Sequence, residues 1–68
     1  MKFIRLKEVI DRTGLARATI YKYMVEGEFP KSVSLGGRSV GWVESEVEAW
    51  IDSKIAARDG SILAHAEL

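Results

Sequence analysis

The sequence predicts a mainly α domain with a small β-hairpin, arranged as a winged helix-turn-helix. Two helical apolar patterns are separated only by residues 14–16, a connection of the length found in helix-turn-helix motifs. An alternating pattern around a glycine pair follows Pro30 and indicates a hairpin. A single apolar stripe of helical spacing comes last. With 68 residues the chain is long enough for one small domain and too short for two.

The first helix is predicted from about Leu6 to Thr13, because apolar residues recur there at helical spacing and Gly14 follows as a natural end. A second helix is predicted from about Arg17 to Glu26. Position 16 is Ala rather than a capping Ser, Thr, Asp or Asn. The missing cap should cost the second helix about 1 kcal/mol at its start.

The hairpin has two short strands whose apolar residues are Val33, Leu35, Val40 and Trp42. A two-residue turn at 36–37 would place Leu35 opposite Arg38. A four-residue loop at 36–39 instead places Leu35 opposite Val40 and likewise pairs the other two apolar residues. We predict the four-residue loop, because it puts all four apolar side chains on one face and leaves Arg38 at the tip.

The last helix is predicted from about Glu44 to Arg58, with Asp59-Gly60 ending it. Its apolar stripe consists of Val43, Val47, Trp50, Ile51 and Ile55. Trp42 and Trp50 are expected to pack in the core rather than to serve as stacking platforms. We therefore expect a winged helix-turn-helix domain over residues 1–58 and a flexible C-terminal tail over 59–68.

Composition argues against several classes of function. The chain is 47% hydrophobic and 29% charged, as expected of a globular protein, and it contains no cysteine. Disulfides, thiolate metal sites and a cysteine nucleophile are thereby excluded. The single histidine, His65, has no neighbouring carboxylate cluster, so we expect no enzyme activity, catalytic residue, cofactor or metal. No apolar run approaches the roughly 20 residues of a membrane span, and we expect a cytoplasmic protein without membrane association.

Charge is unevenly distributed although the formal net charge is zero. Residues 1–42 carry eight basic and four acidic side chains, a net charge of +4, whereas residues 43–68 carry two basic and six acidic ones, a net charge of −4. Such a dipolar domain can present a basic face to a polyanion. The alternative is ordinary scatter in a short chain.

The second helix has the surface expected of a recognition helix. Ile20 and Met24 should face the core, which leaves small, cationic and hydrogen-bonding side chains outside, where they could enter a DNA major groove. Arg38 at the hairpin tip suits a phosphate or a narrow minor groove. The alternative is a solvated helix face with Tyr21 packed on a neighbour. The candidate DNA-binding residues are Arg17, Ala18, Thr19, Tyr21, Lys22, Lys31, Gly37, Arg38 and Ser39.

Six segments resemble the AlpA family of prophage-associated regulators, which is related to phage excisionases and to the DNA-binding domain of MerR-type proteins. They are Leu6-Lys7-Glu8-Val9, Thr13-Gly14-Leu15, Thr19-Ile20-Tyr21-Lys22, Glu26-Gly27-Glu28-Phe29-Pro30, Leu35-Gly36-Gly37-Arg38-Ser39 and the stretch from Trp42 to Trp50. The resemblance covers residues 3–58 and implies a winged helix-turn-helix that binds DNA near integrase or excision genes. The family usually has Ser at the position of Ala16 and often has Ser at the position of Ala18.

Three functions are compatible with these patterns. The first is a sequence-specific transcriptional regulator of prophage or integrative-element genes, with the second helix in the major groove and the hairpin on the backbone or minor groove. The second is an excisionase-type recombination directionality factor that bends DNA. The third is a protein-interaction module that uses the last helix and tail. The expected partners are double-stranded DNA and, beyond it, an integrase or recombinase or other copies of the chain on DNA.

Overall fold

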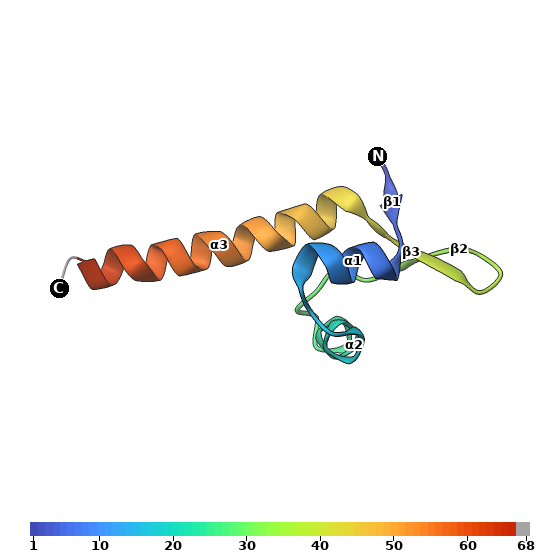
Figure 1. Ribbon diagram of the computed structural model, residues 1–68, viewed down its shortest axis with the longest axis horizontal. Helices are drawn as coiled ribbons and strands as arrows, with labels where there is room; N and C mark the ends of the chain where they lie inside the picture. Colours follow the sequence, from blue (N-terminus) through green and yellow to red (C-terminus); the bar gives the residue numbers. More distant parts are fainter. Residues whose placement is uncertain (67–68) are drawn as a thin grey trace.

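The computed structural model describes the backbone of residues 1–66 and the side chains of residues 1–60. Its elements in chain order are β1 (Phe3–Ile4), α1 (Leu6–Thr13), α2 (Arg17–Val25), β2 (Val33–Gly36), β3 (Ser39–Val43) and α3 (Glu44–Ala66). Figure 1 shows α1, α2 and the sheet gathered at one end of the molecule, while α3 leads away from them. The chain forms a small, mostly helical domain with a three-stranded antiparallel sheet, an arrangement compatible with a winged helix-turn-helix.

The first two helices and their turn agree closely with prediction. α1 has the predicted bounds, and α2 begins at Arg17 as predicted and ends at Val25, one residue before the predicted end. Gly14 ends α1 with a φ of 72°, and its N–H donates to the carbonyl oxygen of Ile10 at 2.8 Å. The hydroxyl of Thr13 accepts a hydrogen bond from the N–H of Leu15 at 3.1 Å, which closes the short turn. No side chain caps the start of α2, in agreement with the Ala at position 16.

The sequence analysis did not predict the short strand β1. It lies along the free edge of β3, which places β3 in the centre of the sheet, and it pairs Phe3 with Val43 and Ile4 with Trp42. The N–H of Glu44 continues this pairing by donating to the carbonyl oxygen of Lys2 at 2.8 Å. Two residues are too few to display an alternating apolar pattern, so this strand becomes recognisable only when its partner is known.

The predicted hairpin register was wrong. In the structure Gly36 pairs with Ser39, so the loop has two residues, and Ser34 rather than Leu35 lies opposite Val40. Gly37 occupies the first central position of the turn with a φ of 55°, a conformation that type II′ hairpin turns need. An irregularity between Ser34 and Gly36 shifts the register, as a β-bulge does.

The physical reason for the error is that the sheet has apolar side chains on both faces. Trp42 faces the helices beside Ile4, whereas Leu35 lies on the opposite face with Phe3. Leu35 and Phe3 both lie against Gly41, where an added Cβ would come within 2.9 Å of Leu35 Cδ1 and 3.3 Å of Phe3 Cβ. Glycine at this central position permits the close approach of the neighbouring strands. The prediction assumed a two-stranded hairpin with a single apolar face.

The hydrophobic core consists of Ile4, Val9, Ile20, Phe29, Trp42 and Val47. Trp42 is fully buried, as predicted, and its indole N–H donates to the carbonyl oxygen of Pro30 at 3.1 Å. Trp50 packs against this core but is only half-buried, with its indole N–H donating to the carbonyl oxygen of Glu28 at 2.6 Å. The core therefore takes residues from every element except β2, and Trp42 is its largest fully buried side chain.

α3 begins at Glu44 as predicted but does not end at Arg58; it continues to Ala66. Glycine inside a helix costs about 1 kcal/mol relative to alanine, so Gly60 weakens the helix without having to end it. The predicted tail at 59–68 thus begins inside α3; residues 67–68 and the side chain of His65 lie outside the described residues. Because α3 leads away from the body, Val47 is buried whereas Ile55 is 44% exposed. Within the described part of the chain, no helix combines the length and apolarity needed to cross a bilayer.

Candidate nucleic-acid interface

α2 presents two different faces. Ile20 is fully buried and Met24 packs against the core, as predicted. Arg17, Ala18 and Lys22 are exposed. Tyr21 is 38% exposed and Thr19 is half-buried, so the outward surface combines two cations with small and hydrogen-bonding groups.

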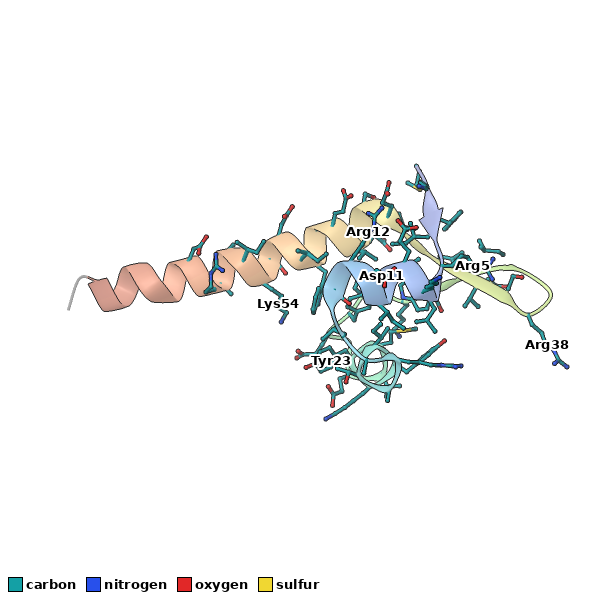
Figure 2. All side chains as sticks on the ribbon, in the orientation of Figure 1. Arg5, Asp11, Arg12, Tyr23, Arg38 and Lys54 are labelled. Atoms are coloured by element: carbon teal, nitrogen blue, oxygen red, sulfur yellow. The ribbon has the colours of Figure 1, made fainter. Side chains whose placement is uncertain are left out.

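The hairpin places Arg38 at its tip, as predicted, at the second position of the two-residue turn. Gly37 and Arg38 are exposed and Ser39 is half-buried. Figure 2 shows Arg38 extending from the tip toward the side of the molecule on which α2 lies. β2 and β3 pair with each other, and Trp42 of β3 lies in the core. The hairpin therefore holds the Arg38 side chain away from the body, where it takes no part in core packing.

Lys31 occupies a different place from the other candidates. It is exposed, and it lines an open surface hollow together with Pro30 and three residues of α3, Glu46, Ala49 and Trp50. The structure therefore brings Lys31 next to the first turns of α3 rather than to the hairpin tip. A carboxylate also borders this hollow, so its charge is mixed.

The cations of α2 and the hairpin form no ion pair with the side chains of residues 1–60. Among the side chains of residues 1–60, the ion pairs involve only Arg12 and Arg58 on the basic side. Arg17, Lys22, Lys31 and Arg38 have no carboxylate partner in that part of the chain. Their charges remain available to an anionic partner.

Arg12 behaves in the opposite way, although the sequence analysis counted it with the other basic residues. Its guanidinium lies 2.5 Å from a carboxylate oxygen of Glu8, 2.8 Å from one of Glu44 and 3.1 Å from one of Glu48. The hydrogen bonds that the Arg12 guanidinium donates to Glu8 and, second, to Glu44 raise the pKa of Arg12 above its ordinary value. This cluster joins α1 to the start of α3. It also pairs one of the eight cations of residues 1–42 with carboxylates, so that this charge is less available to a partner. The i,i+4 spacing of Glu8 and Arg12 is visible in the sequence, whereas only the tertiary contact between the two helices reveals the pairs with Glu44 and Glu48.

Tyr21 touches both the core and the charged surface. Its ring meets the buried ring of Trp42 edge-on, with centroids 6.4 Å apart and an interplanar angle of 64°. The guanidinium carbon of Arg17 lies 5.8 Å from the centroid of the Tyr21 ring. The alternative considered from the sequence, that Tyr21 packs on a neighbour, is correct for this residue.

Comparison with known proteins identifies the family of this chain. The family model described as prophage CP4-57 regulatory protein (AlpA) matches residues 2–55. The chain belongs to the AlpA family. The matched residues include α1, α2 and the whole sheet, so the predicted resemblance is confirmed over the segments that carried it.

Two relatives extend this result. An uncharacterized protein, ORF88 of Enterobacteria phage P4, is 51% identical over 57 residues, which cover 84% of this chain and 65% of the phage protein. The DNA-binding transcriptional activator AlpA of Escherichia coli K12 is 40% identical over 60 residues, which cover 79% of this chain and 86% of that protein. The chain thus spans slightly less than two thirds of the phage relative.

Proposed function

We propose that this AlpA-family protein is a sequence-specific DNA-binding regulator of the transcription of prophage or integrative-element genes. In this proposal it is a winged helix-turn-helix in which α2 enters the major groove and the β2–β3 hairpin is the wing on the adjacent backbone or minor groove. The observation that carries the proposal is the set of exposed cations on α2 and the hairpin tip that lack carboxylate partners among residues 1–60. The name of the Escherichia coli relative, a DNA-binding transcriptional activator, supports it.

Each candidate side chain has a chemically distinct role in this arrangement. Arg17 and Lys22 donate to phosphates or to base acceptors, while Ala18 allows close approach to the groove floor and Thr19 offers a hydroxyl. Tyr21 supports this surface from the core side.

The wing residues have simpler roles. Arg38 reaches a phosphate or inserts into the minor groove, and Gly37 and Ser39 let the DNA backbone approach the turn. Lys31, which is separate from the tip, contributes a more distant phosphate contact.

The zero net charge does not oppose this function, because the charges are separated in space. Three of the carboxylates, those of Glu8, Glu44 and Glu48, surround Arg12. In the view of Figure 2, Arg12 lies on the upper side of the molecule, whereas α2 and Arg38 lie toward the lower side. The Debye length is about 8 Å at physiological salt, so carboxylates beyond that distance repel an approaching phosphate only weakly.

DNase footprinting of the DNA that surrounds the chain's own gene tests the proposal. We expect a discrete protected site, and alanine variants at Arg17 and Lys22 should need several-fold more protein for the same protection while keeping their thermal melts. Unchanged protection in both variants would exclude the α2 surface as the DNA contact.

Circular permutation of the protected fragment then separates the regulator from the excisionase alternative. A position-dependent change in mobility would show a strong bend and favour a recombination directionality factor. Uniform mobility would favour a regulator that acts without strong bending. A protein that binds no duplex but is captured through α3 by another protein would contradict both.

A further inference from the structure

The contacts around Tyr21 indicate more than packing. Arg17 is the first residue of α2, and Tyr21 follows it one turn later on the same helix side. The guanidinium lies within the distance at which a cation is attracted to the face of an aromatic ring, and it has no competing carboxylate among residues 1–60. Within the described side chains, the Tyr21 ring is thus a cation–π partner for Arg17, and no ion pair competes with it.

The ring itself packs against the core. Trp42 holds its edge-on contact to Tyr21 from a fully buried position, and its own indole N–H is anchored on the carbonyl oxygen of Pro30. A ring that packs against a buried side chain offers a defined surface to a long, flexible side chain. The phenolic hydroxyl of Tyr21, by contrast, forms no hydrogen bond with residues 1–60.

We propose that Tyr21 is a positioning residue for DNA recognition: its ring, supported by Trp42, orients the guanidinium of Arg17 before DNA binds. This inference rests on the function proposed above and refines it, because Tyr21 then acts through Arg17 rather than through a hydrogen bond of its own to DNA. Pre-orientation reduces the rotamer freedom that Arg17 loses on binding. Lys22, which no aromatic ring contacts in the described part of the chain, serves as the comparison within the same helix.

The test is a double-mutant cycle on the footprinted fragment, with a scrambled duplex of equal length as the reference. Tyr21→Phe keeps the ring and removes the hydroxyl, whereas Tyr21→Leu removes the ring but retains apolar contact with Trp42. We expect Tyr21→Phe to bind within twofold of the unmodified protein and Tyr21→Leu to bind about two- to fivefold more weakly, the range of an exposed cation–π contact. In an Arg17→Ala background Tyr21→Leu should cause no further loss, whereas in a Lys22→Ala background its effect should persist.

Nuclear magnetic resonance of the free protein supplies a measurement that does not depend on DNA. The ring current of Tyr21 should shift the side-chain resonances of Arg17 upfield in the unmodified protein and in Tyr21→Phe, and this shift should vanish in Tyr21→Leu. The resonances of Lys54, which lies 5.4 Å from the ring centroid of Trp50, should remain unchanged in all three. Thermal melts confirm that each variant is folded.

The outcomes distinguish this inference from the proposed function. Equal losses in Tyr21→Phe and Tyr21→Leu would show a direct contact of the hydroxyl and overturn the positioning role, as would additive losses in the Arg17→Ala background. If the Arg17 resonances of the free protein show no ring-current shift, Tyr21 does not orient Arg17 before DNA binds, and the positioning role is overturned. If the unmodified protein binds no duplex, the proposed function itself fails and the role of Arg17 in recognition fails with it.

Discussion

Arg12 and Arg17 lie five residues apart in the helix-turn-helix segment, and the structure uses them in opposite ways. Arg12 is surrounded by three carboxylates and ties α1 to α3. Arg17 has no carboxylate partner among residues 1–60 and lies over the ring of Tyr21 at the surface. The difference shows that the number of basic residues in a segment does not measure its affinity for a polyanion. What matters is which cations the fold has already neutralised.

The same contrast applies to the two regions as a whole. The α1–α3 contact is closed, because its arginine is already paired with carboxylates of both helices and Val47 of α3 is buried in the core. The α2–hairpin surface is open, because Lys22 and Arg38 are exposed and unpaired within the described residues. Substitutions in the first region should therefore change stability, and those in the second should change binding.

The largest effect is expected at Trp42, which lies in the core that the two regions share. Trp42 is fully buried beneath Tyr21, so Trp42→Ala should cost about 3–5 kcal/mol and abolish cooperative unfolding in so small a domain. Circular dichroism melts measure this. Trp50→Ala is the matched control, and it should cost less because Trp50 is only half-buried. Similar melts for Trp42→Ala and the unmodified protein would show that the core is organised differently.

Removing the cation of the closed region should lower stability without weakening binding. Arg12→Ala leaves the three carboxylates facing one another, and we expect the Tm to fall by about 4–8 °C, as for a weakened network of surface charges in a domain of this size. Arg58→Ala, which removes a more exposed pair with Asp59, is the control and should change the Tm little. Both proteins should bind DNA as the unmodified protein does at temperatures well below the Tm. Loss of DNA affinity in folded Arg12→Ala would place a binding residue in the region that we describe as closed.

Removing a cation from the open region should weaken DNA binding without lowering stability. Lys22→Ala should weaken DNA binding several-fold while the Tm stays nearly unchanged, because Lys22 is exposed and forms no ion pair with residues 1–60. Electrophoretic mobility shifts and thermal melts of the same preparation measure the two quantities together. A lower Tm with unchanged affinity would reverse the assignment of this region.

The smallest effect is expected at the hairpin tip. If Arg38 contacts one phosphate, Arg38→Ala should weaken all duplexes alike and reduce the slope of log affinity against log salt by about 1. If it enters the minor groove, the loss should be greatest where the flanks are rich in A·T pairs. Titrations at several salt concentrations on sites with A·T-rich and G·C-rich flanks distinguish these contacts. Unchanged affinity and slope on both sites would mean that the hairpin only covers the core.

Local patterns in the sequence determined most of the helical part of the fold. The apolar spacing and Gly14 located α1 and the turn, and the change to alternation after Pro30 located the hairpin. The separation of Ile20 from the exposed side of α2 was also predictable. These features depend on residues within one or two turns of one another, so their signal is present in the order of the residues.

Tertiary structure alone decided the rest, because each of these features depends on residues far apart in the chain. β1 forms only because β3 offers it an edge, and its Phe3 lies with Leu35 on the face opposite Trp42, which a two-stranded prediction with one apolar face could not include. Arg12 pairs with Glu8 inside α1, but the carboxylates of Glu44 and Glu48 reach it only because α3 packs beside α1. The orientation of Arg17 likewise requires a ring held by a tryptophan from the sheet. Periodicity reports which side of an element is apolar, but only packing determines what that side meets.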